Sequence, residues 1–122
     1  MQSESNLISL SEDELLIELG KALEADSLGA FPRPIVVLKQ RGREFFERKL
    51  GECQEIICPN NTVRELALGG FTAELVAAVA GLIESITIQS AVAPLAILLC
   101  KKGLTTLCAQ KWGKIPNESS MN

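Results

Sequence analysis

A stretch of sixteen residues without a charged side chain, from Ser85 to Cys100, constrains this chain more than any other feature of its sequence. The stretch reads SITIQSAVAPLAILLC and is followed at once by two lysines. It is shorter than the roughly 20 predominantly apolar residues that a membrane-spanning helix needs, and Pro94 interrupts it. Because apolar side chains are driven out of water, we predict that the stretch is buried at the centre of a folded domain.

The rest of the composition fits one globular domain. The chain has 122 residues, of which 47% are hydrophobic and 22% charged, so it can bury a core without a metal or a disulfide. We expect a single domain over residues 7–113 between polar tails at 1–6 and 114–122. The first residues are polar and acidic, whereas a secretory signal begins with basic residues and continues with an apolar run. This predicts a cytoplasmic protein.

Periodic apolar positions predict helices and no strands. Apolar residues recur at intervals of three and four, and no pair of alternating segments flanks a tight turn. The expected helices run from Ser11 to near Ser27, from Pro34 to about Leu50, over 62–68, from Phe71 to Ser85 and from Ser90 to Trp112. The predicted fold class is all-α, a compact bundle of about five helices around a buried C-terminal helix.

Two of these helices begin with the pattern of a capping box. Ser11 is followed three residues later by Glu14, and Thr62 is followed in the same way by Glu65. In a capping box the first side chain accepts a hydrogen bond from the backbone amide three residues on, and the acid bonds back to the first amide. We therefore expect Ser11 and Thr62 to cap their helices.

The helical periodicity also assigns residues to inner faces. Ile35 and Gly42 share the inner face of the second helix, and Phe71 lies on the apolar side of the fourth. Glycine inside a helix costs about 1 kcal/mol relative to alanine. Gly42 therefore weakens the second helix by about that amount unless a neighbouring segment packs closely against it.

The four cysteines, Cys53, Cys58, Cys100 and Cys108, do not have the spacing of a zinc site. Paired ligands of structural zinc usually have two to four residues between them, whereas seven separate Cys100 from Cys108. The chain also has no histidine. Cysteine is often buried as a small hydrophobe, and a reducing cytosol keeps thiols unbridged. We predict core thiols, with no metal and no cofactor.

The sequence offers little for catalysis or nucleic-acid binding. Without histidine it has no imidazole base, and it has no glycine-rich phosphate loop. Glu74 and Glu84 are ten residues apart, or about 15 Å on a straight helix, too far for a carboxylate pair. The basic residues at 39–49 are interrupted by Glu44 and Glu47. We predict neither an enzyme nor a nucleic-acid-binding protein.

Charge alternates in sign along the chain. The net charge is −6 over residues 1–31, +4 over 32–50, −4 over 51–98 and +3 over 99–122. Two interpretations remain open. In the first, the first two helices form a hairpin whose charges pair within the molecule, where exposed pairs contribute about 0–1 kcal/mol each. In the second, the opposite charges form separate faces that bind a partner.

The second interpretation predicts a small, non-catalytic, adaptor-like interaction module that binds a protein partner or another copy of itself. Its basic face comprises Arg41, Arg43 and Arg48, and its acidic face Glu12, Asp13, Glu14 and Glu18. Contact between an acidic and a basic face is head-to-tail and builds rings or filaments. The alternative function is that of a membrane-active or apolar-ligand-binding protein in which residues 71–108 open as an apolar hairpin.

Overall fold

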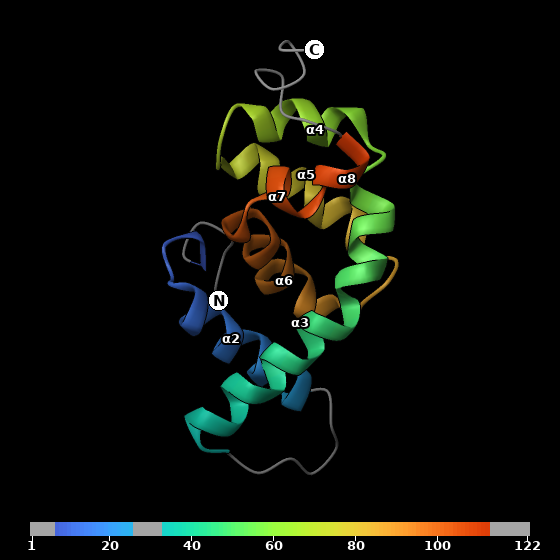
Figure 1. Cartoon of the computed structure of the whole chain (residues 1–122). Coiled ribbons are helices and arrows are strands. Elements are labelled where there is room, and N and C mark those ends of the chain that lie inside the picture. The colour runs from blue at the N-terminus through green and yellow to red at the C-terminus, as the bar shows by residue number, and fades with distance from the viewer. Residues whose placement is uncertain (1–6, 26–32, 113–122) are drawn as a thin grey trace.

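The computed structural model describes residues 7–25 and 33–112. In these residues the chain forms helices and no strands, which confirms the all-α fold class. The helices are α2 (Glu12–Ala25), α3 (Ile35–Ile57), α4 (Asn61–Leu68), α5 (Ala73–Ile83), α6 (Gln89–Lys102), α7 (Leu104–Leu107) and α8 (Ala109–Trp112). Figure 1 shows an elongated molecule with α4 at one end and the start of α3 at the other.

Helix α6 lies at the centre of the core. Its residues from Leu95 to Cys100 are all buried, and α2 and α5 pack against it. Ser90 Oγ donates to the carbonyl oxygen of Ala22, which joins the start of α6 to α2. The prediction that the charge-free stretch is buried is therefore confirmed for residues 91–100, of which only Ala93 is half-buried, whereas Gln89 and Ser90 at the start of α6 are exposed. Within residues 7–25 and 33–112, no helix has both the length and the apolarity that crossing a bilayer requires.

Helices α2 and α3 cross in close contact (Figure 1), with two glycines at the crossing. A Cβ atom on Gly42 would lie 2.0 Å from the carbonyl oxygen of Leu16, and one on Gly20 would lie 2.0 Å from that of Leu38. Neither position has room for a side chain. Of the two possibilities for Gly42, the structure shows the one with a close neighbour.

The helix caps follow the sequence prediction at one of two places. Glu14 N donates to Ser11 Oγ at 3.1 Å, and Ser11 N donates to Glu14 Oε1 at 2.8 Å, so the first capping box is confirmed. The second is wrong, because Asn60 caps α4 by accepting from Val63 N at 2.9 Å. The helix starts one residue earlier than predicted, because the side-chain carbonyl of Asn60 accepts from Val63 N, whereas Thr62 was expected to accept from Glu65 N.

The lengths of two helices differ from the prediction. Helix α3 continues past Leu50 to Ile57, because Cys53 and Ile57 extend its buried face. The helix predicted from Ser90 to Trp112 is broken at Gly103, whose φ of +101° favours glycine, so the central helix is followed by two short ones. The predicted stop near Ser27 and the predicted tails lie outside the described residues.

Candidate interaction surfaces

The structure gives each of the four predicted acidic-face residues a partner within the chain. Glu14 belongs to the capping box of α2. The other three form ion pairs, Glu12 with Lys102 at 3.3 Å, Asp13 with Lys39 at 3.1 Å and Glu18 with Lys21 at 3.3 Å. The acids are therefore spread over contacts with three helices and do not gather into one unpaired patch.

The predicted basic-face residues lie on α3 in three different settings. Arg41 Nε is 2.8 Å from Glu24 Oε2, and Arg33 Nε is 3.4 Å from the other oxygen of the same carboxylate. Arg48 lies over the ring of Phe45, with 5.7 Å between the guanidinium carbon and the ring centroid. Arg43 has no ion pair among the described residues. Two arginines therefore share one carboxylate, but Glu44 lines the same hollow, so these four charges balance.

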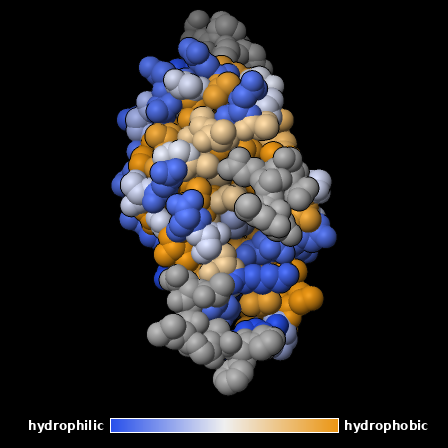
Figure 2. All heavy atoms as spheres, turned by 180° about the vertical axis from the view of Figure 1, so that it is seen from behind, coloured by the Kyte–Doolittle hydropathy of each residue, from blue (hydrophilic) through white to orange (hydrophobic). Residues whose placement is uncertain are grey.

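Three consecutive β-branched residues at the start of α3 are exposed, and we call them the head patch. Ile35 is 63% exposed, Val36 72% and Val37 39%. The two valines line a shallow hollow of about 440 Å³ together with Glu24, Arg33, Gln40, Arg41 and Glu44. Figure 2 shows hydrophobic side chains gathered where α3 begins. The expectation that Ile35 belongs to the core is wrong, because α2 packs against α3 farther along.

A second exposed apolar group lies at the other end of the molecule, between α4 and α5, and we call it the tail patch. It consists of Leu68, which is 50% exposed, and Phe71, which is 40% exposed. Lys101 Nζ lies 5.0 Å from the centroid of the Phe71 ring. Phe71 was expected in the core, but α5 begins only at Ala73, so the ring precedes the helix whose buried face it was predicted to join.

Periodicity did not identify either patch, because it locates an apolar face without showing what covers it. The run of Ile35, Val36 and Val37 was nevertheless a signal. Three apolar residues in succession point in directions about 100° apart on a helix, so one neighbouring helix cannot cover them all.

A disulfide bridge joins Cys58 and Cys108, which corrects the prediction that all four cysteines are thiols. Cys58 follows the last residue of α3, and Cys108 lies between α7 and α8. The indole N–H of Trp112 donates to the carbonyl oxygen of Cys58, and Gln54 Nε2 donates to that of Leu107 at 2.8 Å. The spacing of the cysteines could not predict the bridge, because the fold brings together residues 50 positions apart.

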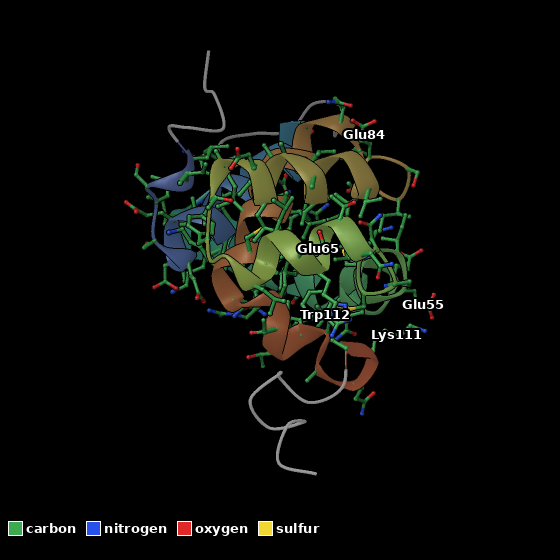
Figure 3. All side chains as sticks on the ribbon, turned by 90° about the horizontal axis from the view of Figure 1, so that it is seen from above. Glu55, Glu65, Glu84, Lys111 and Trp112 are labelled. Atoms are coloured by element: carbon green, nitrogen blue, oxygen red, sulfur yellow. A yellow bond between two sulfur atoms is a disulfide. The ribbon has the colours of Figure 1, made fainter. Side chains whose placement is uncertain are left out.

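A groove of about 390 Å³ lies beside this bridge. Both bridged cysteines line it, with Gly51, Gln54, Glu55, Pro59, Leu107, Gln110 and Lys111. Figure 3 shows Glu55, Lys111 and Trp112 at this end of the molecule, seen from above. The groove therefore opens on a disulfide with one carboxylate and one ammonium group nearby.

The other two cysteines are buried thiols. Burial raises the pKa of Cys53 to about 11 and that of Cys100 to about 12, because the thiolate loses its hydration in the core. For Cys53 the nearby Glu52 adds to the increase, whereas Lys49 opposes it. No group of three or more potential metal ligands occurs in the part of the chain that the structure describes.

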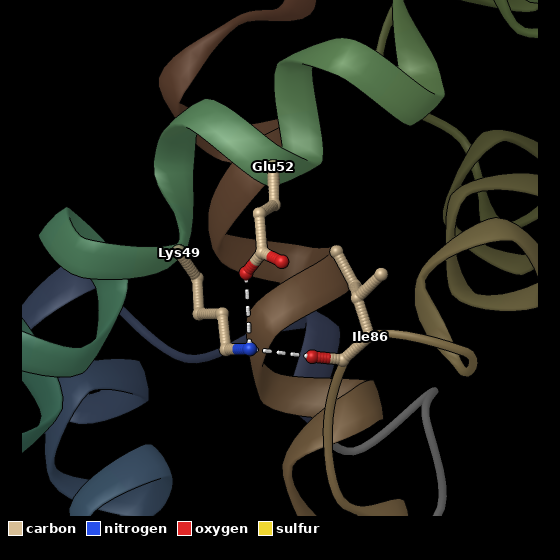
Figure 4. A network of polar contacts seen from close by, with 3 residues as sticks. All are labelled: Lys49, Glu52 and Ile86. Carbon is tan, nitrogen blue, oxygen red and sulfur yellow. Dashed lines mark hydrogen bonds and ion pairs between the residues drawn. The ribbon is translucent and has the colours of Figure 1, made fainter.

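Lys49 joins α3 to the connection between α5 and α6. Its ammonium group donates to the carbonyl oxygen of Ile86 at 2.7 Å and lies 3.1 Å from Glu52 Oε1 (Figure 4). The backbone carbonyl is thereby satisfied in the absence of a helical partner. We assign this network a structural role.

Comparison of the chain with protein-family models, curated proteins and solved structures found no match in any of the three.

Proposed function

We propose that this protein is a small, non-catalytic helical interaction module that associates with further copies of itself, head patch against tail patch. The observation that carries the proposal is the pair of exposed apolar patches at opposite ends of one molecule. The start of α3 and the end of α4 are too far apart in Figure 1 to cover each other. In two copies, the head patch of one can cover the tail patch of the next.

The apolar contact supplies the favourable energy. Scattered exposed aliphatic residues are ordinary, but the head patch joins Ile35, Val36 and Val37 in one exposed group. An aliphatic or aromatic side chain gains about 1.5–3 kcal/mol when it is fully buried. Five side chains cover less than the roughly 1,200 Å² of a stable interface. We therefore expect a weak, reversible association.

Charge gives the contact little direction. The head patch lies beside Arg33 and Arg41, but Glu24 and Glu44 line the same hollow. At the other end, Glu65 and Glu74 are exposed and have no ion pair among the described residues. Arg64 and Lys101 also lie on this side, so neither end has a strong net charge. The apolar side chains therefore supply most of the affinity.

This proposal changes the residues that the sequence indicated. Arg41 and Arg43 remain at the head end, whereas Arg48 lies farther along α3 over Phe45. The acidic side moves to Glu65 and Glu74, because the four acids of the predicted face already have partners within the molecule. A contact between two different patches is heterologous, so it builds open chains or rings rather than a closed dimer.

Analytical ultracentrifugation tests the proposal. Between about 10 µM and 1 mM, the range of weak contacts, we expect the mean mass of the wild-type protein to rise with concentration. Val36→Asp and Phe71→Asp should each remain monomeric. Gln89→Asp, which adds the same charge at an exposed position outside both patches, should associate like the wild type.

Mixing the two variants provides the decisive measurement. Val36→Asp retains an intact tail and Phe71→Asp an intact head, so an equal mixture should form dimers and nothing larger. A wild-type mass that does not depend on concentration would exclude self-association. A mixture that stays monomeric, although the wild type associates, would exclude the head-to-tail arrangement and indicate contact between like patches.

A further inference from the structure

The geometry points to a thiol–disulfide exchange site at the Cys58–Cys108 bridge, where a low-molecular-weight thiol would open the bridge and release α8. This inference is independent of the proposed self-association, because the bridge lies at neither patch. Three features of the structure carry it: what the bridge joins, how little else holds α8, and the groove that reaches both cysteines.

The bridge joins the end of α3 to the junction of α7 and α8. The two short helices have four residues each, and an isolated helix of that length is unstable in water. Helix α7 has additional anchors, because Leu104 is buried and Gln54 donates to the carbonyl oxygen of Leu107.

Helix α8 has fewer anchors, and two of them converge on Cys58. One is the disulfide, which holds the residue just before α8. The other is Trp112, whose indole N–H donates to the carbonyl oxygen of Cys58 and whose side chain is mostly buried. The main helical neighbour of α8 is α7. Opening the bridge therefore removes the covalent link between α8 and Cys58. What remains at Cys58 is the hydrogen bond from Trp112 and the packing of the Trp112 ring.

The groove gives a small thiol access to the bridge. Both cysteines line it, although each is largely buried, which favours a small reagent over a bulky one. Lys111 also lines the groove and favours a thiolate there, whereas Glu55 opposes it. The thiols of Cys53 and Cys100 do not compete, because both are buried and remain protonated near neutral pH.

The exchange proceeds in two steps. The thiolate of the small thiol attacks one sulfur of the bridge, forms a mixed disulfide with that cysteine and displaces the other cysteine as a thiolate. A second molecule of the thiol attacks the mixed disulfide, frees the remaining cysteine and leaves as the oxidised dimer of the reagent. Two molecules of thiol thus supply two electrons, and their two protons end on Cys58 and Cys108.

The fluorescence of Trp112 reports the release, because this is the only tryptophan of the chain. We expect millimolar reduced glutathione, added to the native protein, to shift the tryptophan emission to longer wavelength. Alkylation followed by mass spectrometry should show two additional thiols at Cys58 and Cys108. The helical signal in circular dichroism should change little, since α8 contributes only four residues.

Two variants serve as controls. The double variant Cys58→Ser/Cys108→Ser should show the shifted emission without glutathione and should not respond to it. Cys53→Ala removes a buried thiol on the same helix but leaves the bridge, so it should respond like the wild type.

Three results would overturn the inference. The first is a bridge that glutathione opens only in denaturant. The second is opening without a change in tryptophan emission. The third is opening that abolishes the helical signal, because the bridge would then hold the whole domain rather than α8.

Discussion

Gly20 and Gly42 face each other where α2 crosses α3, and neither can accept a side chain. A Cβ atom on Gly42 would lie 3.2 Å from the backbone nitrogen of Gly20 and 2.0 Å from the carbonyl oxygen of Leu16. The two backbones are therefore in direct contact at this point. This contact places Asp13 opposite Lys39 and Glu24 opposite Arg41, so the crossing also sets the ion pairs between the helices.

Substitution of either glycine should destabilise the fold. Gly42→Ala places a methyl group on backbone that cannot move aside, so we expect a loss of at least about 1–3 kcal/mol, the range of an overpacked core. Gly51→Ala and Gly81→Ala are matched controls, because both lie inside helices and have no atom within 4 Å of the added Cβ. They should be neutral or stabilising by up to about 1 kcal/mol. Chemical denaturation measures all three, and equal effects would contradict the close crossing.

The two neighbouring asparagines before α4 should differ in their contribution to stability. Asn60→Ala removes the side-chain oxygen that accepts from Val63 N, and loss of such a cap costs about 0.5–2 kcal/mol. Asn61→Ala changes the adjacent exposed residue, which makes no capping bond in the structure, and should have little effect. If Asn61→Ala proved to be the costlier change, the cap assignment would be wrong.

Loss of the bridge should lower the free energy of unfolding. Cys58 and Cys108 are 50 residues apart, and the entropy of closing a loop of that length corresponds to about 4 kcal/mol. We expect the free energy of unfolding of Cys58→Ser/Cys108→Ser to be lower than that of the wild type by about 4 kcal/mol. The variant should therefore unfold at a lower denaturant concentration. The reduced wild-type protein should match the double variant, and a large difference between the two would show that the serines, not the missing bridge, cause the effect.

The buried thiols should make stability fall at high pH. The pKa of Cys53 is raised from 9.0 to about 11 and that of Cys100 to about 12, so both thiols are protonated in either state below pH 9. Above pH 9 the unfolded chain loses these protons first. The contribution of the two thiols to the free energy of unfolding is therefore complete below about pH 9. It is lost as the pH rises through their folded-state pKa values of about 11 and about 12.

Alkylation rates measure the same pKa shifts directly. At pH 8 the thiolate fraction should be about 100-fold below that of an ordinary thiol for Cys53 and about 1,000-fold below it for Cys100. Iodoacetamide should therefore react with both at their ordinary rates only after unfolding. Rapid labelling of either cysteine in the native protein would show that its site is open to solvent.

Local patterns in the sequence predicted the features that depend on residues close together in the chain. The helical periodicity indicated an all-α fold, and Ser11 and Glu14 indicated the start of α2, because both bonds of that box lie within four residues. The charge-free stretch indicated a buried segment, because burial of so many aliphatic residues does not depend on which neighbours cover them. The glycine at 42 left open whether it weakens its helix or allows a close contact.

Only the tertiary structure decided which distant residues meet. Glu12 pairs with Lys102 across 90 positions, and Cys58 pairs with Cys108 across 50. No local rule relates such residues, because packing of whole helices sets their separation. The same packing left Ile35 and Phe71 exposed although each had the periodicity of a core residue. The sequence by itself determined the helices and their apolar faces, whereas the arrangement of those helices decided which faces were covered.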